Sequence, residues 1–399
     1  MSFQKWHSLL LATAATVLAV SLMLFPQQSL EASLRGLSIW WDVVFPSLLP
    51  FFIISELLIA FGVVSFIGAY MEPLMRPLFR VPGTGGFVWA MGLASGYPAG
   101  AKLTTRLWED GRISTIEAER LVSFTNSSNP LFIFGAIAIG FFHDPALGIV
   151  LAAAHYGGNI IVGLIMRFHG TQTEQSTKKK SFPSLAKAFH LLHEERIKDE
   201  RPIGKKLGDA VHSSVQTLLM IGGFIILFSV LNEVLSLLRF TEIFAAFIHV
   251  LLAMIGLSSD FGIPIVSGLF EMTLGSQLVS LTDTPLKQQA IVTSFLLAFA
   301  GLSAQAQAAS LLAPTAIRFL PFFVARIMQG FFAACIAAVT FDWLYQPKSA
   351  HVFTGADPLY MIEHSVHQFF AVAPFITLIT LIVFIFLRHR RLIHQRVDG

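Results

Sequence analysis

Long apolar runs recur along almost the whole chain and constrain its fold more than any other feature. Eight of them reach about 20 residues, the length that an α-helix needs to cross a bilayer. These predicted spans are roughly residues 9–25, 43–69, 121–142, 146–168, 211–238, 286–313, 319–341 and 369–387. Only 13% of the 399 residues are charged, about half the share in a soluble protein, which nearly excludes a water-soluble enzyme. The sequence therefore predicts an all-α, polytopic helical membrane protein.

Two apolar stretches, residues 83–101 and 261–280, are rich in Gly, Pro or Ser and do not fit a continuous helix. Non-helical backbone at membrane depth is tolerated only inside protein or beside water. We predict that each stretch forms a re-entrant hairpin. For the first, the alternative is a Gly-rich helix that packs closely on its neighbour. Residues 244–257 are too short for a comfortable span and are predicted to lie along the surface.

Clusters of Lys and Arg predict the orientation, because basic residues mark the cytoplasmic side of a membrane protein. One cluster follows the first hairpin, one fills the loop 169–210 and one forms the tail: Lys102, Arg106, Arg112 and Arg120; Lys178, Lys179, Lys180, Lys187, Arg196, Lys198, Arg201, Lys205 and Lys206; Arg388, Arg390, Arg391 and Arg396. With a cytoplasmic N-terminus, eight spans place all three clusters inside. The net charge of +3 therefore reports topology and does not indicate nucleic-acid binding.

The number of crossings predicts an inverted repeat. The chain crosses three times between residue 43 and the long loop, and three times again between residues 211 and 341. An odd number makes the second block enter the membrane in the opposite direction, as in secondary transporters. An offset of 171 residues aligns Ser123-Phe124 with Ser294-Phe295 and His155 with Arg326. The predicted organisation is an N-terminal anchor (1–41), a first repeat (42–168), a cytoplasmic basic loop (169–210), a second, inverted repeat (211–343), and an outer loop, last span and basic tail (344–399).

The predicted span 121–142 opens with a cluster of hydroxyl and amide side chains. Asn126, Ser127, Ser128 and Asn129 lie together just before an apolar stretch. In lipid an unsatisfied polar group costs several kcal/mol, so the cluster must face protein, water or a ligand. We predict a solute-binding break in the helix. The alternative is a polar seam that joins two helices.

Two further segments supply polar groups to the predicted solute site. The run Gly92–Ala101 holds three glycines and a proline, which interrupt a helix and leave backbone groups for a ligand. In the matching segment of the second half, residues 299–308, small and amide side chains would face the same solute if the segment is broken or extended. The alternative is a helix that packs on its neighbour through small residues. The residues assigned are Ser95 and Gly96 in the first segment and Ser303, Gln305 and Gln307 in the second.

Three charged residues fall within predicted membrane segments. Glu271 lies in the second hairpin, Arg326 in the span 319–341 and Glu56 in the span 43–69. A charge at the bilayer centre costs about 2.5–3.5 kcal/mol, so it marks a proton or cation path by default. Glu271 is the predicted coupling residue, with Arg326 as its counter-charge and Glu56 as a second candidate. The alternative is a buried ion pair that fixes helix register.

Signatures of enzymes and cofactor sites are absent from the sequence. The single cysteine, Cys335, excludes an internal disulfide and a Cys-based metal site. His193-Glu194-Glu195 begins like a metalloprotease helix, but position 197 is Ile, so the second metal ligand is missing. We therefore expect no enzymatic activity, no cofactor and no metal.

Four segments resemble a known family. Residues 46–52, 92–102, 123–135 and 268–277 are similar to the YlbJ family of sporulation integral membrane proteins, within the nucleoside-recognition or gate-domain group. The resemblance covers roughly residues 8–345. It implies an endospore-forming bacterium, expression in the mother cell and a role in building the spore cortex.

The same group includes concentrative nucleoside transporters and the membrane part of the ferrous-iron transporter B family. The resemblance implies inverted repeats, re-entrant hairpins and polar breaks near the midplane. Gly268-Leu269-Phe270-Glu271 is similar to the group's first hairpin motif, in which a Gln-Thr-Glu triplet contacts the solute. Here Phe270 and Met272 flank the acid, so the resemblance implies the architecture and not a nucleoside substrate.

Together these features predict a secondary-transporter-like carrier of a small polar solute, needed for endospore formation and coupled to a proton or sodium ion. The alternative is a non-transporting scaffold that recruits cortex-assembly proteins through the loop 169–210 and the basic tail. The expected location is the mother-cell or outer forespore membrane, with both termini in the cytoplasm. The expected partners are the lipid bilayer, the solute, and a second copy of the chain or cortex-assembly proteins.

Overall fold

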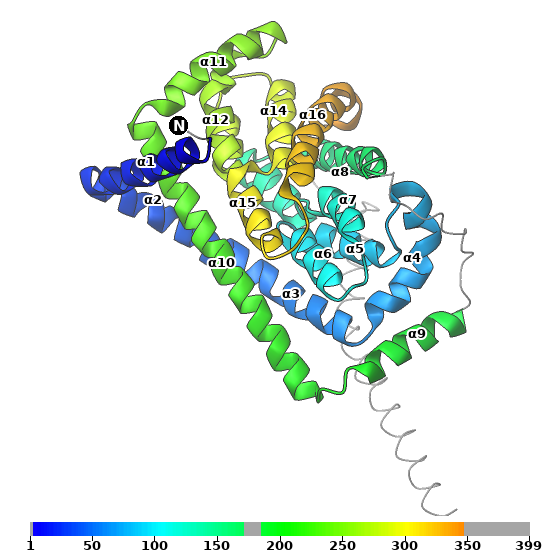
Figure 1. Ribbon diagram of the computed structural model, residues 1–399. Helices are drawn as coiled ribbons and strands as arrows, with labels where there is room; N and C mark the ends of the chain where they lie inside the picture. The colour runs from blue at the N-terminus through cyan, green and yellow to red at the C-terminus, as the bar shows by residue number, and fades with distance from the viewer. Residues whose placement is uncertain (1–2, 171–184, 347–399) are drawn as a thin grey trace, which may run out of the picture. The chain divides into compact units, whose positions relative to one another are not determined.

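The computed structural model describes residues 3–170 and 185–346, and this part of the chain is built of helices (Figure 1). Its first half contains α1 (Phe3–Leu24), α2 (Pro26–Ser38), π-helical η1 (Ile39–Val44), α3 (Phe45–Ala60), α4 (Val63–Phe79), α5 (Thr84–Ser95), α6 (Ala99–Glu109), α7 (Thr115–Thr125), π-helical η2 (Leu131–Phe141) and α8 (Leu147–Met166). The second half contains α9 (Leu185–Lys198), α10 (Ile203–Leu237), α11 (Phe240–Met254), η4 (Ser259–Phe261), α12 (Gly262–Phe270), α13 (Met272–Ser280), α14 (Leu286–Phe299), α15 (Gly301–Leu312) and α16 (Phe319–Leu344). The predicted all-helical architecture is confirmed for these residues, and the predicted span 369–387 lies outside them.

Four helical segments are long and apolar enough to cross a membrane: α8, α10, α14 with α15, and α16. The count rises to six if each of two bent helix pairs is taken as one span. The predicted span 121–142 corresponds to α7 and η2, which are two short segments. The described residues therefore support a multi-pass membrane protein with four to six spans, against the seven that the sequence predicts for them.

The chain bends sharply at two places in its N-terminal part. The predicted span 43–69 is wrong as a single helix, because α3 ends at Ala60 and α4 leaves it at 84°. Gly62, between them, has a φ of +77°, a left-handed conformation that ends helices. The predicted span 9–25 corresponds to the single helix α1, and the chain turns by 105° after it, at Phe25, just before Pro26 at the first position of α2.

Both predicted hairpins are pairs of short helices that pack on each other. Three residues, Gly96–Pro98, separate α5 from α6, and Glu271 alone separates α12 from α13. The same order of elements occurs twice, in residues 84–166 and 262–344: a hairpin of two short helices, a second interrupted helix and a long helix. The interruption of both stretches is confirmed, while their entry into the membrane stays a prediction.

The long helices α8, α14 and α16 pack into one group. Helix α16 packs along α14 and α8, and α7 packs against α8 and α16. Their contacts bury an apolar cluster that includes Ile133, Leu151, Leu297 and Ala333. Helix α10 runs beside α2 and α3 (Figure 1). Residues far apart in sequence thus pack against one another.

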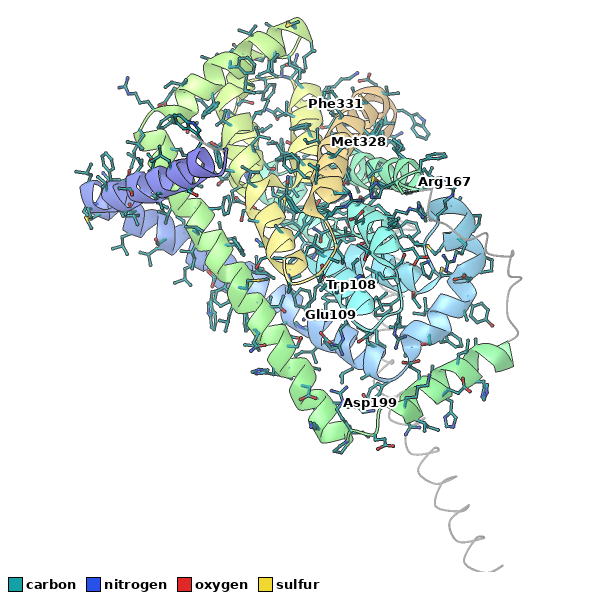
Figure 2. The ribbon with its side chains drawn as sticks, in the orientation of Figure 1. Trp108, Glu109, Arg167, Asp199, Met328 and Phe331 are labelled. Atoms are coloured by element: carbon teal, nitrogen blue, oxygen red, sulfur yellow. The ribbon has the colours of Figure 1, made fainter. Side chains whose placement is uncertain are left out.

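Large apolar side chains remain exposed on several of these helices. Phe331 on α16 is 66% exposed, and it lies with Met328 well away from the charged Glu109 and Asp199 (Figure 2). Exposed apolar surface on this scale is unfavourable in water and suits contact with lipid. The exposed apolar surface therefore agrees with a membrane protein.

Candidate functional site

Four breaks interrupt the helices, two in the first half of the described chain and two in the second. They lie at Gly96–Pro98, Asn126–Pro130, Glu271 and Ala300. The first contains a cis Tyr97–Pro98 peptide bond, and Ala300 has a φ of +72°. Each break ends one helix and starts another, so backbone groups that a continuous helix would pair are left for side chains or a ligand.

Two glycines of the first hairpin make room for the break after α7. A Cβ at Gly92 would lie 2.1 Å from the carbonyl oxygen of Thr125, and one at Gly100 would lie 2.4 Å from the same atom. Both distances are far below van der Waals contact, so a side chain does not fit at either position without a backbone shift. The Nδ2 of Asn129 also donates a 3.0 Å hydrogen bond to the carbonyl of Ser95. The hairpin and the break therefore hold each other in place.

Two buried side chains, from α8 and α16, support the same break from behind. Arg326 is fully buried and donates to the carbonyl of Asn126 at 2.7 Å and to the carbonyl of Ser123. His155 is also fully buried, and its Nε2 accepts the N–H of Ser128 at 3.0 Å. These bonds satisfy main-chain groups that the interrupted helix leaves without helical partners. The break is thus a defined structural element and not a loose loop.

The predicted role of Arg326 as a counter-charge to Glu271 differs from the observed contacts. No ion pair joins the two among the described residues, because the Arg326 guanidinium is directed at the main-chain carbonyls of the first-half break. The Glu271 carboxylate instead accepts the N–H of Thr273 at 3.0 Å and of Leu274 at 2.8 Å. It therefore caps α13 at the end where the helix dipole favours a negative charge.

The two breaks of the second half touch each other. Gly301 has a φ of +65°, and a Cβ there would lie 3.0 Å from the backbone nitrogen of Met272 and 3.2 Å from the carbonyl oxygen of Gly268. Helix α15 therefore starts directly against the tip of the second hairpin, beside Glu271. The predicted segment is both interrupted and helical, because the break lies at Ala300 and Gly301–Leu312 is a helix.

A cavity of about 790 Å³, which we call the central cavity, lies among the four breaks. Most of the predicted solute-binding residues line it: Ser95, Gly96, Ser128, Asn129, Glu271, Ser303 and Gln307. Asn126, Ser127 and Gln305 do not, and each is at most 1% exposed. Gln305 turns back along the chain and donates to the carbonyl of Phe299 at 3.0 Å. The structure thus brings together polar groups from both halves and places three predicted residues behind the wall.

Several residues outside the predicted set complete the central cavity. Tyr97 lines it and donates to the carbonyl of Leu297 at 3.2 Å, which links the first hairpin to α14. The sequence signal for the role of Tyr97 is its position in a Gly-rich run beside a proline. Asp42 of η1 and Thr273 of α13 also line it, without a comparable signal. The remaining walls, from η1, η2 and α10, are largely apolar: Ile39, Leu131, Phe132, Phe141, Ile221 and Ile225. Apolar walls with a few convergent polar groups are typical of small-molecule sites.

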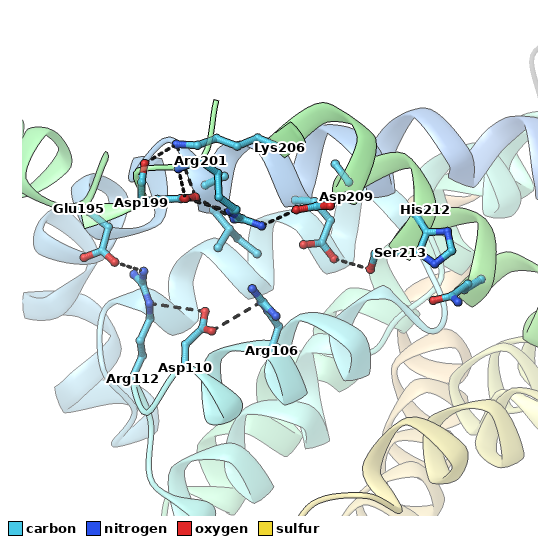
Figure 3. A pocket seen from close by; sticks show the side chains of 15 residues that line it. Arg106, Asp110, Arg112, Glu195, Asp199, Arg201, Lys206, Asp209, His212 and Ser213 are labelled. Atoms are coloured by element: carbon cyan, nitrogen blue, oxygen red, sulfur yellow. Dashed lines mark hydrogen bonds and ion pairs between the residues drawn. The ribbon is translucent and has the colours of Figure 1, made fainter. Parts of the chain in front are cut away.

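Glu56 lies elsewhere, in a second pocket of about 570 Å³ lined mainly by charged residues (Figure 3). Residues of α3, α6, the α6–α7 turn, α9 and α10 form this charged pocket. Arg112 and Glu195 are paired across it at 2.5 Å. At its rim, hydrogen bonds from Arg201 hold the pKa of the Asp199 carboxyl below its usual range. The predicted site residues that line a cavity are therefore divided between two pockets, while Asn126, Ser127, Gln305 and Arg326 line neither.

The fold and the site define a class: a helical membrane protein in which two split hairpins and two interrupted helices surround one cavity. The family model described as Gate, nucleoside recognition, matches residues 41–143. That range runs from η1 to just past η2 and contains the first hairpin and the break that Arg326 supports.

Comparison of the full chain identifies the family. The chain is 57% identical over 348 residues to the Sporulation integral membrane protein YlbJ of Bacillus subtilis, covering 86% of this chain and 85% of that protein. The protein therefore belongs to the YlbJ family of sporulation integral membrane proteins, as the sequence motifs predict. A shorter match to an uncharacterized protein of Alkalihalophilus pseudofirmus has 33% identity over 89 residues, 22% of this chain and 19% of that one. No solved structure matches the chain significantly.

Proposed function

We propose that this protein carries a small polar solute across the cell membrane during endospore formation, by alternating access around the central cavity. One observation carries the proposal: polar side chains from both halves, including Ser95, Asn129, Glu271 and Gln307, converge on that cavity. A volume of about 790 Å³ is within the range of pockets that hold small organic molecules. The membrane location and the link to sporulation follow from the family.

The proposal includes an inverted repeat. The repeated order of elements in residues 84–166 and 262–344 supports it. At the offset of 171, His155 corresponds to Arg326; their helices pack together, and both side chains bind the break after α7. Two repeats that enter the membrane in opposite directions allow one to rock against the other, so that a site between them faces each side in turn.

We further propose eight spans with both termini and the loop 169–210 in the cytoplasm, in the mother-cell or outer forespore membrane. The distribution of Lys and Arg supports this orientation. In it the central cavity faces outward, because its lining continues along η2 to Phe141, next to the turn 142–146 that would lie outside. The charged pocket, formed by α9 and the start of α10, would lie on the cytoplasmic side.

Glu271 is the proposed coupling residue for a proton or a sodium ion. Its two carboxylate oxygens accept the first N–H groups of α13 while the residue lines the central cavity. A bound proton or cation would compete with the positive end of α13 for the carboxylate. Ion binding at Glu271 would therefore change the tip of the second hairpin, which contacts the start of α15.

The scaffold hypothesis remains the competing proposal, and one contact weighs against it. Helix α9, which belongs to the loop 169–210, packs on α4 through the rings of Phe66 and Phe189 at 5.1 Å. This part of the loop is therefore built into the fold and is not a free docking segment. Lys178, Lys179 and Lys180, which precede α9 in sequence, are the residues that a scaffold would need and a carrier would not.

The test uses a Bacillus subtilis strain in which this chain replaces the endogenous YlbJ. Glu271→Gln and Asn129→Ala alter the central cavity, while a triple change of Lys178, Lys179 and Lys180 to Ser alters the loop. The carrier proposal predicts fewer heat-resistant spores from each cavity variant and a normal number from the loop variant, at equal amounts of protein in the membrane. The reverse pattern would support the scaffold and refute the carrier.

A further inference from the structure

The central cavity and the charged pocket lie along the same three elements. Helix α3 contributes Leu48 to the central cavity and Glu56 to the charged pocket. Helix α10 lines the central cavity with Ile221 and the charged pocket with Gln216. The first hairpin does the same, since its break lines the central cavity and the end of α6 lines the charged pocket. A route between the two pockets would therefore run between α3, α6 and α10.

A compact apolar cluster fills the space between these three elements. It contains Trp40, Leu48, Phe52, Ala99, Leu218 and Ile221. Phe52 of α3 is 2% exposed, Ala99 of α6 is 1% exposed and Leu218 of α10 is 0% exposed. Each of these helices thus supplies a buried side chain to one packed layer, and a polar solute does not cross such a layer without separating the helices.

An ion pair lies directly beside this apolar layer, on the side of the charged pocket. The Nζ of Lys102 on α6 is 4.7 Å from the centre of the Phe52 ring and 3.4 Å from Oε1 of Glu56 on α3. The same carboxylate oxygen accepts a 3.1 Å hydrogen bond from the Ser213 hydroxyl on α10. Lys102 is only 9% exposed, so its ammonium group depends on Glu56 and on the ring for stabilisation. The side chains of Glu56, Lys102 and Ser213 thus connect α3, α6 and α10 at one position along these helices.

We propose that the charged pocket is the cytoplasmic vestibule of the solute route, and that Phe52 with the Lys102–Glu56 pair is the barrier that closes this vestibule from the central cavity. The inference rests on the proposed carrier function and adds the path that the solute takes. In the conformation described, the lining of the central cavity extends along η2 to Phe141, and the barrier is shut. Opening it requires α6 to move away from α3 and α10, which breaks the ion pair and unpacks Phe52.

Cysteine accessibility tests the barrier without a transported solute. The only native cysteine is replaced by Cys335→Ala, and single cysteines are then introduced as Ser303→Cys in the central cavity and Gln216→Cys in the charged pocket. A membrane-impermeant methanethiosulfonate reagent is added to sealed inside-out vesicles, so that it reaches only the cytoplasmic face. We expect rapid labelling of Gln216→Cys and slow labelling of Ser303→Cys.

Weakening the barrier should expose the central cavity to the same reagent. We expect Phe52→Ala, and separately Glu56→Gln, to speed labelling of Ser303→Cys by about tenfold or more, which corresponds to about 1.4 kcal/mol in the closed–open equilibrium. Phe51→Ala is the matched control, because Phe51 is the neighbouring residue on α3 and is 40% exposed. It should leave the rate unchanged. Exchange of the two charges, as Lys102→Glu with Glu56→Lys, should restore slow labelling.

Unchanged labelling of Ser303→Cys in both Phe52→Ala and Glu56→Gln, with normal protein amounts and rapid labelling of Gln216→Cys, would overturn the barrier. Slow labelling of Gln216→Cys would overturn the assignment of the vestibule. These outcomes are distinct from failure of the carrier proposal. A barrier that opens as expected in a protein that accumulates no solute would refute transport alone.

Discussion

Arg326 and Asn126 are joined by a 2.7 Å hydrogen bond from a fully buried guanidinium to a main-chain carbonyl, 200 residues away in the chain. The bond links the long helix α16 of the second half to the break after α7 in the first half. A buried arginine is costly unless its N–H groups are paired, and the broken helix supplies carbonyl groups that need donors. Each feature therefore stabilises the other, and together they hold one wall of the central cavity.

Replacement of Arg326 should destabilise the whole protein. Arg326→Gln shortens the side chain and leaves at least one buried carbonyl without a donor, so we expect a loss of about 3 kcal/mol in the free energy of unfolding. Thermal denaturation in detergent measures the effect. Arg196→Gln, at an exposed position of α9, is the control. Equal melting temperatures for the two variants would show that the buried arginine does not support the break.

The close approach of the first hairpin to the break predicts a large effect of one methyl group. In Gly100→Ala, the new Cβ would lie 2.4 Å from the Thr125 carbonyl oxygen, so we expect destabilisation by about 2 kcal/mol. Gly223→Ala is the matched control on α10, where a Cβ meets nothing within 4 Å. That variant should be as stable as the native chain or slightly more stable, because Ala favours helix over Gly. Similar behaviour of both variants would contradict the observed packing.

The cap on α13 predicts a local effect of Glu271. In Glu271→Ala, the N–H groups of Thr273 and Leu274 lose their acceptor, which should cost about 1 kcal/mol. Hydrogen–deuterium exchange should become faster in the first turn of α13 and stay unchanged in α16. Glu271→Gln keeps an acceptor oxygen and should show a smaller change. Exchange that is unaltered in Glu271→Ala would mean that the carboxylate does not cap the helix.

A tyrosine just beyond α16 predicts a specific dependence on alkaline pH. The hydroxyl of Tyr345 donates a 2.7 Å hydrogen bond to Asp144, and this bond, with partial burial, raises the pKa of Tyr345 to about 12. Because the folded pKa lies above the unfolded value of about 10, this contribution to stability is complete below about pH 10. It is lost as the pH rises through 12.

Melting temperatures across this range measure the effect of Tyr345. The difference in stability between the native chain and Tyr345→Phe should be constant below about pH 10 and shrink between about pH 10 and 12. Tyr70→Phe, on α4, serves as the control for general alkaline effects. A difference that does not change over this interval would exclude the Tyr345–Asp144 bond.

Local signals in the sequence predicted the broken helices well. The Gly and Pro residues at 92–101 and the amide and hydroxyl groups at 126–129 mark two of the four breaks, because both patterns disfavour continuous helix in lipid. Ser128 and Asn129 of the second group, together with Ser95 and Gly96 of the first, also line the central cavity. The sequence was less informative where partners are distant, since Arg326 pairs with backbone carbonyls, which no side-chain pattern reveals.

Hydropathy alone does not predict where an apolar run bends or whether a basic residue is buried. The run 43–69 is apolar throughout, yet the left-handed conformation of Gly62 turns the chain by 84° and divides it into α3 and α4. Lys102 looks like a marker of the cytoplasmic side, but its ammonium group is buried against Glu56 and Phe52. A basic residue next to a membrane segment can thus belong to the interior of the protein, and only the packing distinguishes the two cases.

Accumulation of solutes by purified protein tests the central claim most directly. Proteoliposomes with an imposed proton or sodium gradient are incubated with a small-molecule extract of sporulating cells, and their contents are identified by mass spectrometry. We predict that at least one small polar solute accumulates with the native chain and with Glu242→Gln, an exposed acid on α11, but not with Glu271→Gln. Contents indistinguishable from protein-free liposomes under both gradients would contradict the account.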